Sequence, residues 1–164
     1  MINLKENFHC MPAIPPTSGN AGRTGDYILM ENAHAIWTIV ALRRPTAGGC
    51  AVTHEVASDF AGTGSSAVST GILTWASSGH LRNRGEYLRP KTSSAVGYTF
   101  PSATGIAFMI SRFDPAAVMA KTSNTHYTVK TGTLASANDG VTAMYFVEPR
   151  YKGVEYLLAT TSST

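Results

Sequence analysis

The five histidines are the residues of this chain with the widest range of possible chemistry, because an imidazole can serve as a metal ligand or as a general base. None of them stands at a metal-ligand spacing from another; they are His9, His34, His54, His80 and His126. His54 and Glu55 open a pair typical of metalloproteases, but that motif needs a second histidine one helical turn later, where this chain has Ser58. We expect His54 to be an ordinary strand residue, and we predict no bound metal.

The glycine-rich stretch of residues 61–66, Ala-Gly-Thr-Gly-Ser-Ser, is the second place to look for chemistry. A phosphate-binding loop needs a lysine after its last glycine, and a dinucleotide fingerprint needs a third glycine within a βαβ unit. This stretch meets neither requirement and is typical of a flexible loop between strands. The ten acidic residues are isolated from one another in the sequence, so no carboxylate pair for acid–base catalysis can be named. We predict no catalytic site and no cofactor.

A basic group near the middle of the chain has two interpretations, a solvated loop or an electrostatic contact with an acidic partner surface. Its members are Arg82, Arg84, Arg89 and Lys91, and Glu86 lies among them. The formal net charge of the chain is only +3. Because no ladder of aromatic residues accompanies the basic group, we expect no direct contact with nucleic acid.

Length and composition indicate one folded domain. The chain has 164 residues, of which 43% are hydrophobic and only 14% are charged. A usual protein has about 25% charged residues, and this balance argues against intrinsic disorder. No apolar run approaches the roughly 18 residues of a membrane span, and the first residues lack the apolar stretch of a signal peptide, so we expect no membrane association. Cys10 and Cys50 are expected to be free thiols.

Short runs of β-branched and aromatic residues alternate with turns rich in glycine, proline and serine, which predicts an all-β fold. Strands are expected at residues 34–42, 50–57, 67–75, 107–113, 126–134 and 141–148. One helical turn is expected after Asp114, which is suited to cap it. We predict an antiparallel β-sandwich or barrel-like domain over residues 25–164, preceded by an irregular, extended N-terminal arm over residues 1–24 that contains Pro12, Pro15 and Pro16.

The first predicted strand is apolar on both sides. Ile36, Thr38, Val40 and Leu42 share one side and Trp37, Ile39 and Ala41 share the other, which indicates that both sides are at least partly covered. The predicted core residues are Trp37, Ile39, Val40, Val52, Ile110, Val129 and Phe146. Asn138-Asp139-Gly140 is expected to turn the chain between the last two strands, with Gly140 at positive φ.

Four segments resemble a family of tailed-bacteriophage virion proteins, which are encoded with the head genes and described as structural or decoration proteins. Residues 24–33 resemble the opening strand of that family, and residues 53–68 a strand followed by an Asp-x-Ala-Gly-Thr-Gly loop. Phe113-Asp114 resembles a strand end, and residues 144–153 the last strand with its Pro-Arg-Tyr-x-Gly exit. This chain departs from the family pattern in Glu55, where glutamine is frequent, and in its longer basic middle section.

The resemblance implies a non-enzymatic capsid decoration (cement) protein, made in the host cytoplasm, that binds the outer surface of the virion head. Its partner is then the major capsid protein, whose subunit contacts it stabilises, and it is expected to associate with itself as a dimer or trimer. The residues expected to contact partners are Leu4, Phe8, Met11, Pro12, Ile14 and Pro15 of the arm and Arg82, Arg84, Arg89 and Lys91 of the basic group. Alternatives are a tail or head–tail connector protein, a carbohydrate-binding appendage, or a small β-fold hydrolase.

Overall fold

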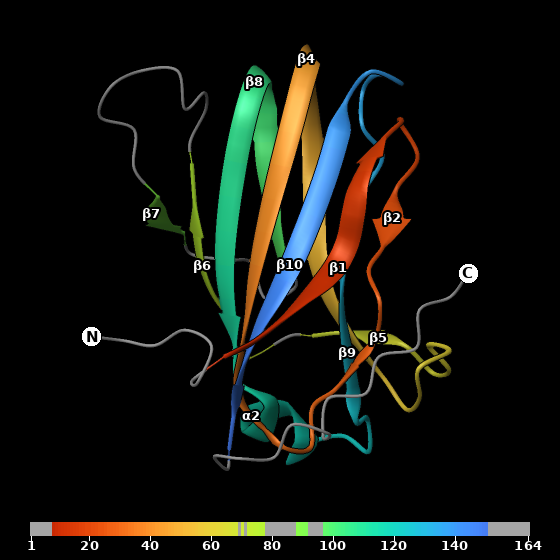
Figure 1. The fold of residues 1–164 in the computed structure, drawn as a ribbon, viewed down its shortest axis with the longest axis vertical. Helices are drawn as coiled ribbons and strands as arrows, with labels where there is room; N and C mark the ends of the chain where they lie inside the picture. Colours follow the sequence, from red (N-terminus) through yellow and green to blue (C-terminus); the bar gives the residue numbers. More distant parts are fainter. Residues whose placement is uncertain (1–7, 69, 71, 78–87, 92–96, 151–164) are drawn as a thin grey trace.

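The computed structural model describes residues 8–68, 70, 72–77, 88–91 and 97–150 (Figure 1). In that part the chain is almost entirely antiparallel β-sheet, with one short helix, which confirms the predicted all-β, sandwich-like fold. The long strands are β1 (His9–Ser18), β4 (Ala33–Ala57), β8 (Gly97–Phe113) and β10 (Gly140–Pro149). The shorter elements are β2 (Arg23–Thr24), β3 (Ile28–Leu29), β5 (Ser66–Ala67), β6 (Ile72–Ala76), β7 (Arg89–Lys91), α2 (Pro115–Met119) and β9 (His126–Thr131).

Two long strands, β4 and β8, form the frame of the molecule. They pair antiparallel from Ile36 opposite Phe113 to Thr53 opposite Gly97. In Figure 1, β4 rises at the front, bends over at the top and descends behind, and β8 runs beside it in the opposite direction. The front parts of both strands belong to a front sheet with the strand order β1-β10-β4-β8-β6-β7. The remaining halves belong to a rear sheet, in which β9 pairs with β4 and also with β2 and β3.

A buried arginine holds the bend between the two sheets. Arg44 is only 1% exposed, and its Nη1 donates to the carbonyl oxygens of Gly48 at 2.6 Å and Pro101 at 2.8 Å. The β4–β8 register shifts on either side of Gly48, and Gly105 on β8 has a φ of +109°, which favours glycine. The guanidinium therefore ties both bent strands together, because it needs acceptors when it is removed from water. The predicted strands at 34–42 and 50–57 are consequently one bent strand.

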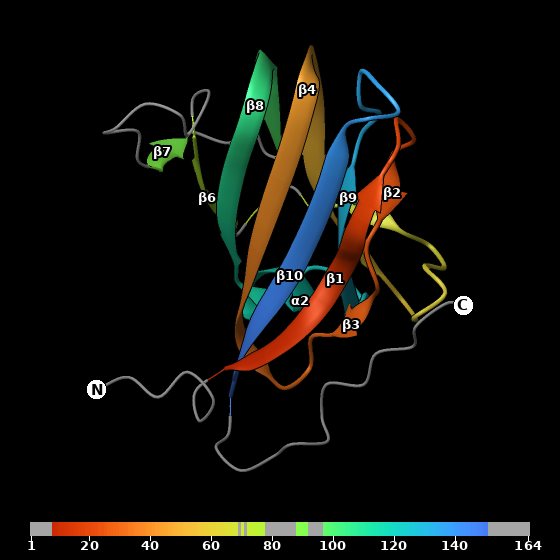
Figure 2. The same cartoon turned by 45° about the horizontal axis from the view of Figure 1, so that its top comes forward.

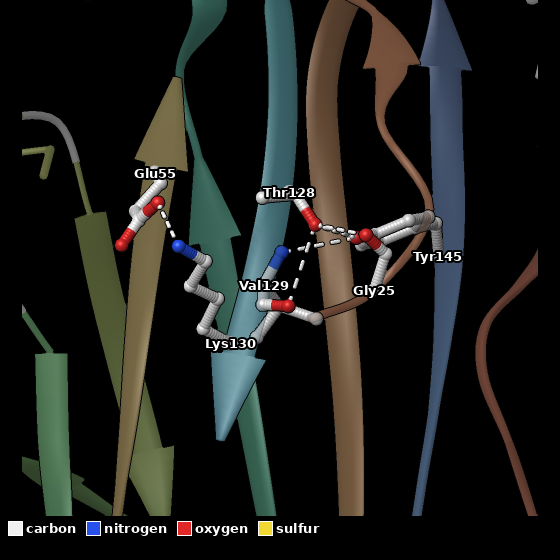
Figure 3. Close-up of polar contacts among 6 residues, drawn as sticks. All are labelled: Gly25, Glu55, Thr128, Val129, Lys130 and Tyr145. Atoms are coloured by element: carbon white, nitrogen blue, oxygen red, sulfur yellow. Dashed lines mark hydrogen bonds and ion pairs between the residues drawn. The ribbon is translucent and has the colours of Figure 1, made fainter. Parts of the chain in front are cut away.

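The core lies between the two sheets and contains a polar network. The Tyr127 hydroxyl on β9 lies 2.9 Å from Thr38 Oγ1 and 2.6 Å from His54 Nδ1, so it joins both halves of β4. The Tyr145 hydroxyl on β10 accepts from the backbone N–H of Val129 at 3.0 Å (Figure 3). It also donates to the carbonyl oxygen of Asp26. These bonds cross between the sheets and fix their relative position, because each buried hydroxyl must find partners.

The N-terminal segment differs from the expected extended arm over residues 1–24. His9–Ser18 is β1, an edge strand of the front sheet that pairs with β10 through two register shifts. Its prolines are tolerated because an edge strand leaves one row of backbone groups unpaired. Ala13 and Ile14 are buried in the core. This segment is therefore part of the folded domain.

The connection through Asn138-Asp139-Gly140 also differs from the expected hairpin. The backbone N–H of Asp139 donates to the carbonyl oxygen of Ser136, and the Asp139 carboxylate accepts from the Ser136 N–H, each at 3.0 Å, so a turn is present. It joins β9 to β10, which lie in different sheets and do not pair with each other. Gly140 starts β10 and is not among the glycines with positive φ. A crossover between sheets does not require the conformation that a tight hairpin requires.

The short helix α2 lies at the lower end of the sandwich (Figure 2). The Asp114 carboxylate accepts from the backbone N–H of Ala116 at 3.0 Å, and Pro115 occupies the first helical position, as predicted. Pro115 and Val118 are buried against the core. No helix in the described part of the chain is long and apolar enough to cross a membrane.

Candidate interaction surface

The outer side of the front sheet is the most unusual surface of the molecule. On β4, Trp37, Ile39 and Ala41 alternate with buried residues and point away from the core. The register places Phe146 and Met144 of β10 beside the first two of these residues. We call this surface the outer face, and its apolar members are Trp37, Ile39, Ala41, Leu73, Trp75, Ile106, Phe108, Ile110, Met144 and Phe146.

The outer face includes the exposed large hydrophobic residues of the described chain. Leu73 is 57% exposed, Ile106 is 50% exposed and Met144 is 41% exposed. Four residues predicted to be core lie here and are only partly buried: Trp37, Ile39, Ile110 and Phe146. The other three, Val40, Val52 and Val129, are fully buried as predicted. The prediction failed because an apolar alternation indicates that a side is suited to contact and does not indicate what covers it.

Two open hollows run along the outer face. The described residues that line the first, of about 320 Å³, are all apolar, namely Phe8, Trp37, Ile39, Ile110 and Phe146. The second, of about 430 Å³, lies between the end of β1 and the upper parts of β4, β8 and β10, where it includes Arg43 and Ile106. Side chains from distant parts of the sequence therefore form one continuous, hollowed apolar surface.

Aromatic stacking makes the centre of the outer face rigid. The rings of Trp37 and Trp75 are stacked, with centroids 6.1 Å apart and an interplanar angle of 20°. The Arg112 guanidinium carbon lies 5.9 Å from the Trp37 ring centroid, within cation–π range. A carbohydrate site also needs convergent polar groups for the sugar hydroxyls. Because the described residues around the hollow beside Trp37 offer no such groups, the surface fits an apolar protein partner better than a glycan.

Both edges of the front sheet are protected against strand addition. At one edge, β1 carries Pro12, Pro15 and Pro16, and at the other edge β7 reads Arg89-Pro90-Lys91. Proline removes a backbone donor and a charged side chain disfavours edge-to-edge pairing. The outer face, and not a sheet edge, is therefore the surface best suited to association.

The expected partner-binding residues of the N-terminal segment are divided between the surface and the core. Phe8 lines the first hollow of the outer face, and Pro12 and Pro15 are exposed on β1. Met11 is half-buried against the core, and Ile14 is only 3% exposed. Ile14 is therefore not available to a partner, because the register shift between Pro12 and Ile14 turns it inward beside Ala13. Leu4 lies outside the described residues.

Half of the expected basic group can be placed. Arg82 and Arg84 lie outside the described residues, whereas Arg89 and Lys91 are on the edge strand β7. The Lys91 ammonium lies 5.9 Å from the ring centroid of Tyr98 on β8. Arg89 is opposite the buried Ala76 and Lys91 is opposite the buried Thr74, so these two residues form a basic margin at the β7 edge, on the side of the strand away from the outer face.

His54 lies in the core, where its ring packs against and bonds to Tyr127. Its ring is fully buried, stacks on Tyr127 with centroids 5.8 Å apart, and bonds to the Tyr127 hydroxyl. Burial lowers the pKa of His54 to about 4, so the imidazole is neutral at pH 7. The described residues contain no group of three or more metal-ligating side chains, and His80 lies outside them.

Both cysteines are free: Cys10 is exposed and Cys50 is buried, and burial raises the pKa of the Cys50 thiol.

The glycine-rich loop is held by its own polar groups. Asp59 accepts from the backbone N–H of Thr63 at 2.9 Å, and hydrogen bonds from the side chain and the backbone of Thr63 lower the pKa of the Asp59 carboxyl group. Gly62 and Gly64 have positive φ values of 80° and 62°. A Cβ at Gly62 would lie 2.8 Å from the Tyr27 hydroxyl, so that glycine is required for packing as well as for conformation. The conformation of the turn and its packing against Tyr27 therefore explain these glycines.

Comparisons with known proteins establish no family. No protein-family model matches the chain, and no curated protein matches it. Among solved structures, the SPBc2 prophage-derived protein YomS is 11% identical over 85% of this chain and 91% of its own, with a TM-score of 0.44. The N-terminal cellulose-binding domain of Cellulomonas fimi β-1,4-glucanase C is 9% identical over 96% of this chain and 81% of its own, with a TM-score of 0.28. A carbohydrate-binding module of Cellvibrio mixtus lichenase 5A is 8% identical over 90% and 95%, with a TM-score of 0.29.

These TM-scores are all below 0.5, and likenesses of this size do not indicate a shared function. Fold and surface together define the molecule as an all-β sandwich with an open apolar sheet face.

Proposed function

We propose that the protein is a non-enzymatic assembly component of a bacteriophage virion, and specifically a decoration (cement) protein on the outside of the head. The observation that carries this proposal is the open, aromatic outer face of the front sheet. A soluble protein rarely leaves a large apolar patch exposed unless the patch binds another surface. The resemblance of four sequence segments to phage virion proteins supplies the kind of partner, the major capsid protein.

The arrangement of the surface suits such a role. The outer face provides apolar contact for assembly, and the basic margin at Arg89 and Lys91, at the β7 edge of the sheet, provides charge contact with an acidic capsid exterior. Buried apolar contacts hold a complex, while charges at its margin mainly change the association rate and the salt dependence. Many copies on a repetitive shell need only modest affinity each, because multivalent attachment multiplies their effect.

The direct test is co-sedimentation of the purified protein with heads that lack decoration, at low and at high salt. We expect saturable binding at a fixed ratio to the major capsid protein, with weaker binding at high salt. The variant Arg89→Gln/Lys91→Gln should lose the salt dependence and retain most of the binding. Absence of binding by the intact, folded protein at both salt concentrations would overturn the proposal.

A symmetry-resolved image of decorated particles separates this function from another place in the virion. A decoration protein repeats over the whole shell, whereas a connector or tail protein is confined to one vertex or to the tail. Density at a single vertex would contradict decoration and favour the connector alternative.

A further inference from the structure

The charges on the outer face are arranged in a way that suggests its partner. In the part of the chain that the structure describes, the charged side chains of this face are Arg43, Arg112 and Glu148. Arg43 lies at the upper end of β4 and is exposed. Glu148 lies at the lower end of β10, directly opposite Ala35. Neither residue forms an ion pair within the described chain. Opposite charges therefore flank the two ends of one apolar surface.

The spacing of these charges is symmetric about the centre of the outer face. On β4, Ile39 lies midway between Arg43 and Ala35, at about 14 Å from each along the strand. Ile39 is opposite Met144, so the central row of the face is apolar, with Met144 exposed and Ile39 partly buried. A twofold axis along this row, perpendicular to the strands, exchanges the two ends of the sheet. It places Arg43 of each copy over the end of the other copy that carries Glu148.

We propose that the outer face is the interface of a symmetric dimer, in which the front sheets of two copies pack face to face. Each copy then places Met144 and Ile39 at the centre and exchanges two Arg43–Glu148 contacts across the axis. Such an interface is isologous, which is the commonest form of association between identical chains. Two sheets packed in this way lie about 10 Å apart, a gap that long side chains such as arginine span.

The size of the outer face fits this partner. Five strands, from β1 to β6, span about 19 Å across the sheet, and the row from Ala35 to Arg43 spans about 27 Å along it. The flat area is therefore about 500 Å², and the hollows and protruding side chains add to it. A stable dimer needs about 800 Å² from each partner, which is of the same order.

The biological role of this dimer rests on the proposed function, which it deepens. Two copies that are joined through their outer faces present every other surface of the molecule twice. The paired basic margins can then contact two neighbouring capsid subunits at once, which is how a bridging protein gains affinity from weak contacts. The dimer itself is a property of the purified protein and can be measured without heads.

The experiment is sedimentation velocity of the purified full chain over a wide range of concentrations. We expect a species of twice the 17.4 kDa chain mass. Met144→Asp introduces a charge at the centre and should weaken the dimer about tenfold or more. Thr99→Asp introduces the same charge at an exposed strand position outside the outer face, and should leave the dimer unchanged. Far-ultraviolet circular dichroism verifies that each variant is folded.

A charge exchange tests the symmetry itself. Arg43→Glu alone and Glu148→Arg alone should each weaken the dimer about fivefold or more, because each places like charges together. The double variant, Arg43→Glu/Glu148→Arg, should restore the dimer to within about twofold of the original, whereas Lys121→Glu should have no effect. A double variant as weak as the single ones would overturn the twofold arrangement.

Two other results would overturn the dimer while leaving the proposed function standing. One is a protein that is monomeric at every concentration and still binds heads. The other is a dimer that is insensitive to Met144→Asp. If a monomer binds heads and loses that binding with Met144→Asp, the capsid protein is the occupant of the outer face.

Discussion

The two sides of the front sheet have nearly the same amino-acid chemistry and opposite environments. On the inner side of β4, Ile36 and Val40 are fully buried against the rear sheet. On the outer side, the equally apolar Trp37 and Ile39 line an open hollow. The rear sheet of the same chain covers the inner side, whereas the outer side is open and suited to contact with another molecule. An apolar pattern in a sequence therefore marks a contact surface without stating whether the contact lies within the molecule or between molecules.

The largest expected difference comes from neighbouring residues of β8 that point to opposite sides. Met109 is fully buried, and Met109→Ala should lower the free energy of unfolding by about 2–5 kcal/mol, because it leaves a cavity in the core. Ile110 lines the outer hollow, and Ile110→Ala should cost less than about 1 kcal/mol in the monomer. Denaturant titrations below the association concentration measure both values. Equal costs would mean that the outer side is covered.

A second prediction concerns His54, which is fully buried in the half of β4 that pairs with β9. The His54 pKa is lowered to about 4 in the folded protein from an ordinary value of 6.5, so its neutral form is favoured by folding. This contribution is fully present above pH 6.5 and is lost as the pH falls from 6.5 toward 4. The loss amounts to about 3 kcal/mol.

Thermal unfolding between pH 7 and pH 4 measures this loss in the wild type and two variants. His54→Gln should show a shallower decline in this window than the wild type. The exposed His34 provides the control, and His34→Gln should keep the wild-type profile. If His54→Gln keeps the full decline, another group is responsible for it.

The smallest predicted effect concerns single hydroxyl groups. Tyr127→Phe removes the partner of both Thr38 and His54 inside the core and should lower the free energy of unfolding by about 1–3 kcal/mol. Tyr98 is only half-buried, and Tyr98→Phe should change that free energy by less than about 0.5 kcal/mol. Chemical denaturation of the two variants sharpens the comparison between buried and accessible groups. A neutral Tyr127→Phe would show that the inner network does not need its hydroxyl.

The sequence predicts local features well where neighbouring residues determine them. The all-β class, the cap at Asp114 and the burial of Val40, Val52 and Val129 follow from short patterns. The sequence does not predict the bend of β4, because the Gly48-Gly49 pair is typical of the end of a strand. The buried Arg44, which holds the bend, donates to the carbonyl oxygen of Pro101, and that partner lies far along the chain. The strand β1 was missed because proline-rich segments form strands only at sheet edges, which no local pattern reveals.

The sequence likewise does not predict the outer face. Its residues come from four strands and become neighbours only through their register, as Trp37 does with Phe146 and Ile110 does with Trp75. One signal was present: the first strand is apolar on both sides, although a sandwich needs only one apolar side. Such an excess of apolar residues indicates a second contact surface, which the single chain does not fill.

The most direct test of the account is the binding of Ile39→Asp to heads that lack decoration, compared with the wild type by co-sedimentation. Ile39 lies at the centre of the outer face and outside the core, so the variant should fold with an unchanged circular dichroism spectrum. The account predicts that its apparent affinity for heads falls about tenfold or more, because a charge on the outer face breaks the dimer and with it the two-point attachment to the head. A folded Ile39→Asp variant that binds heads as tightly as the wild type would contradict the claim that the outer face makes this protein an assembly component.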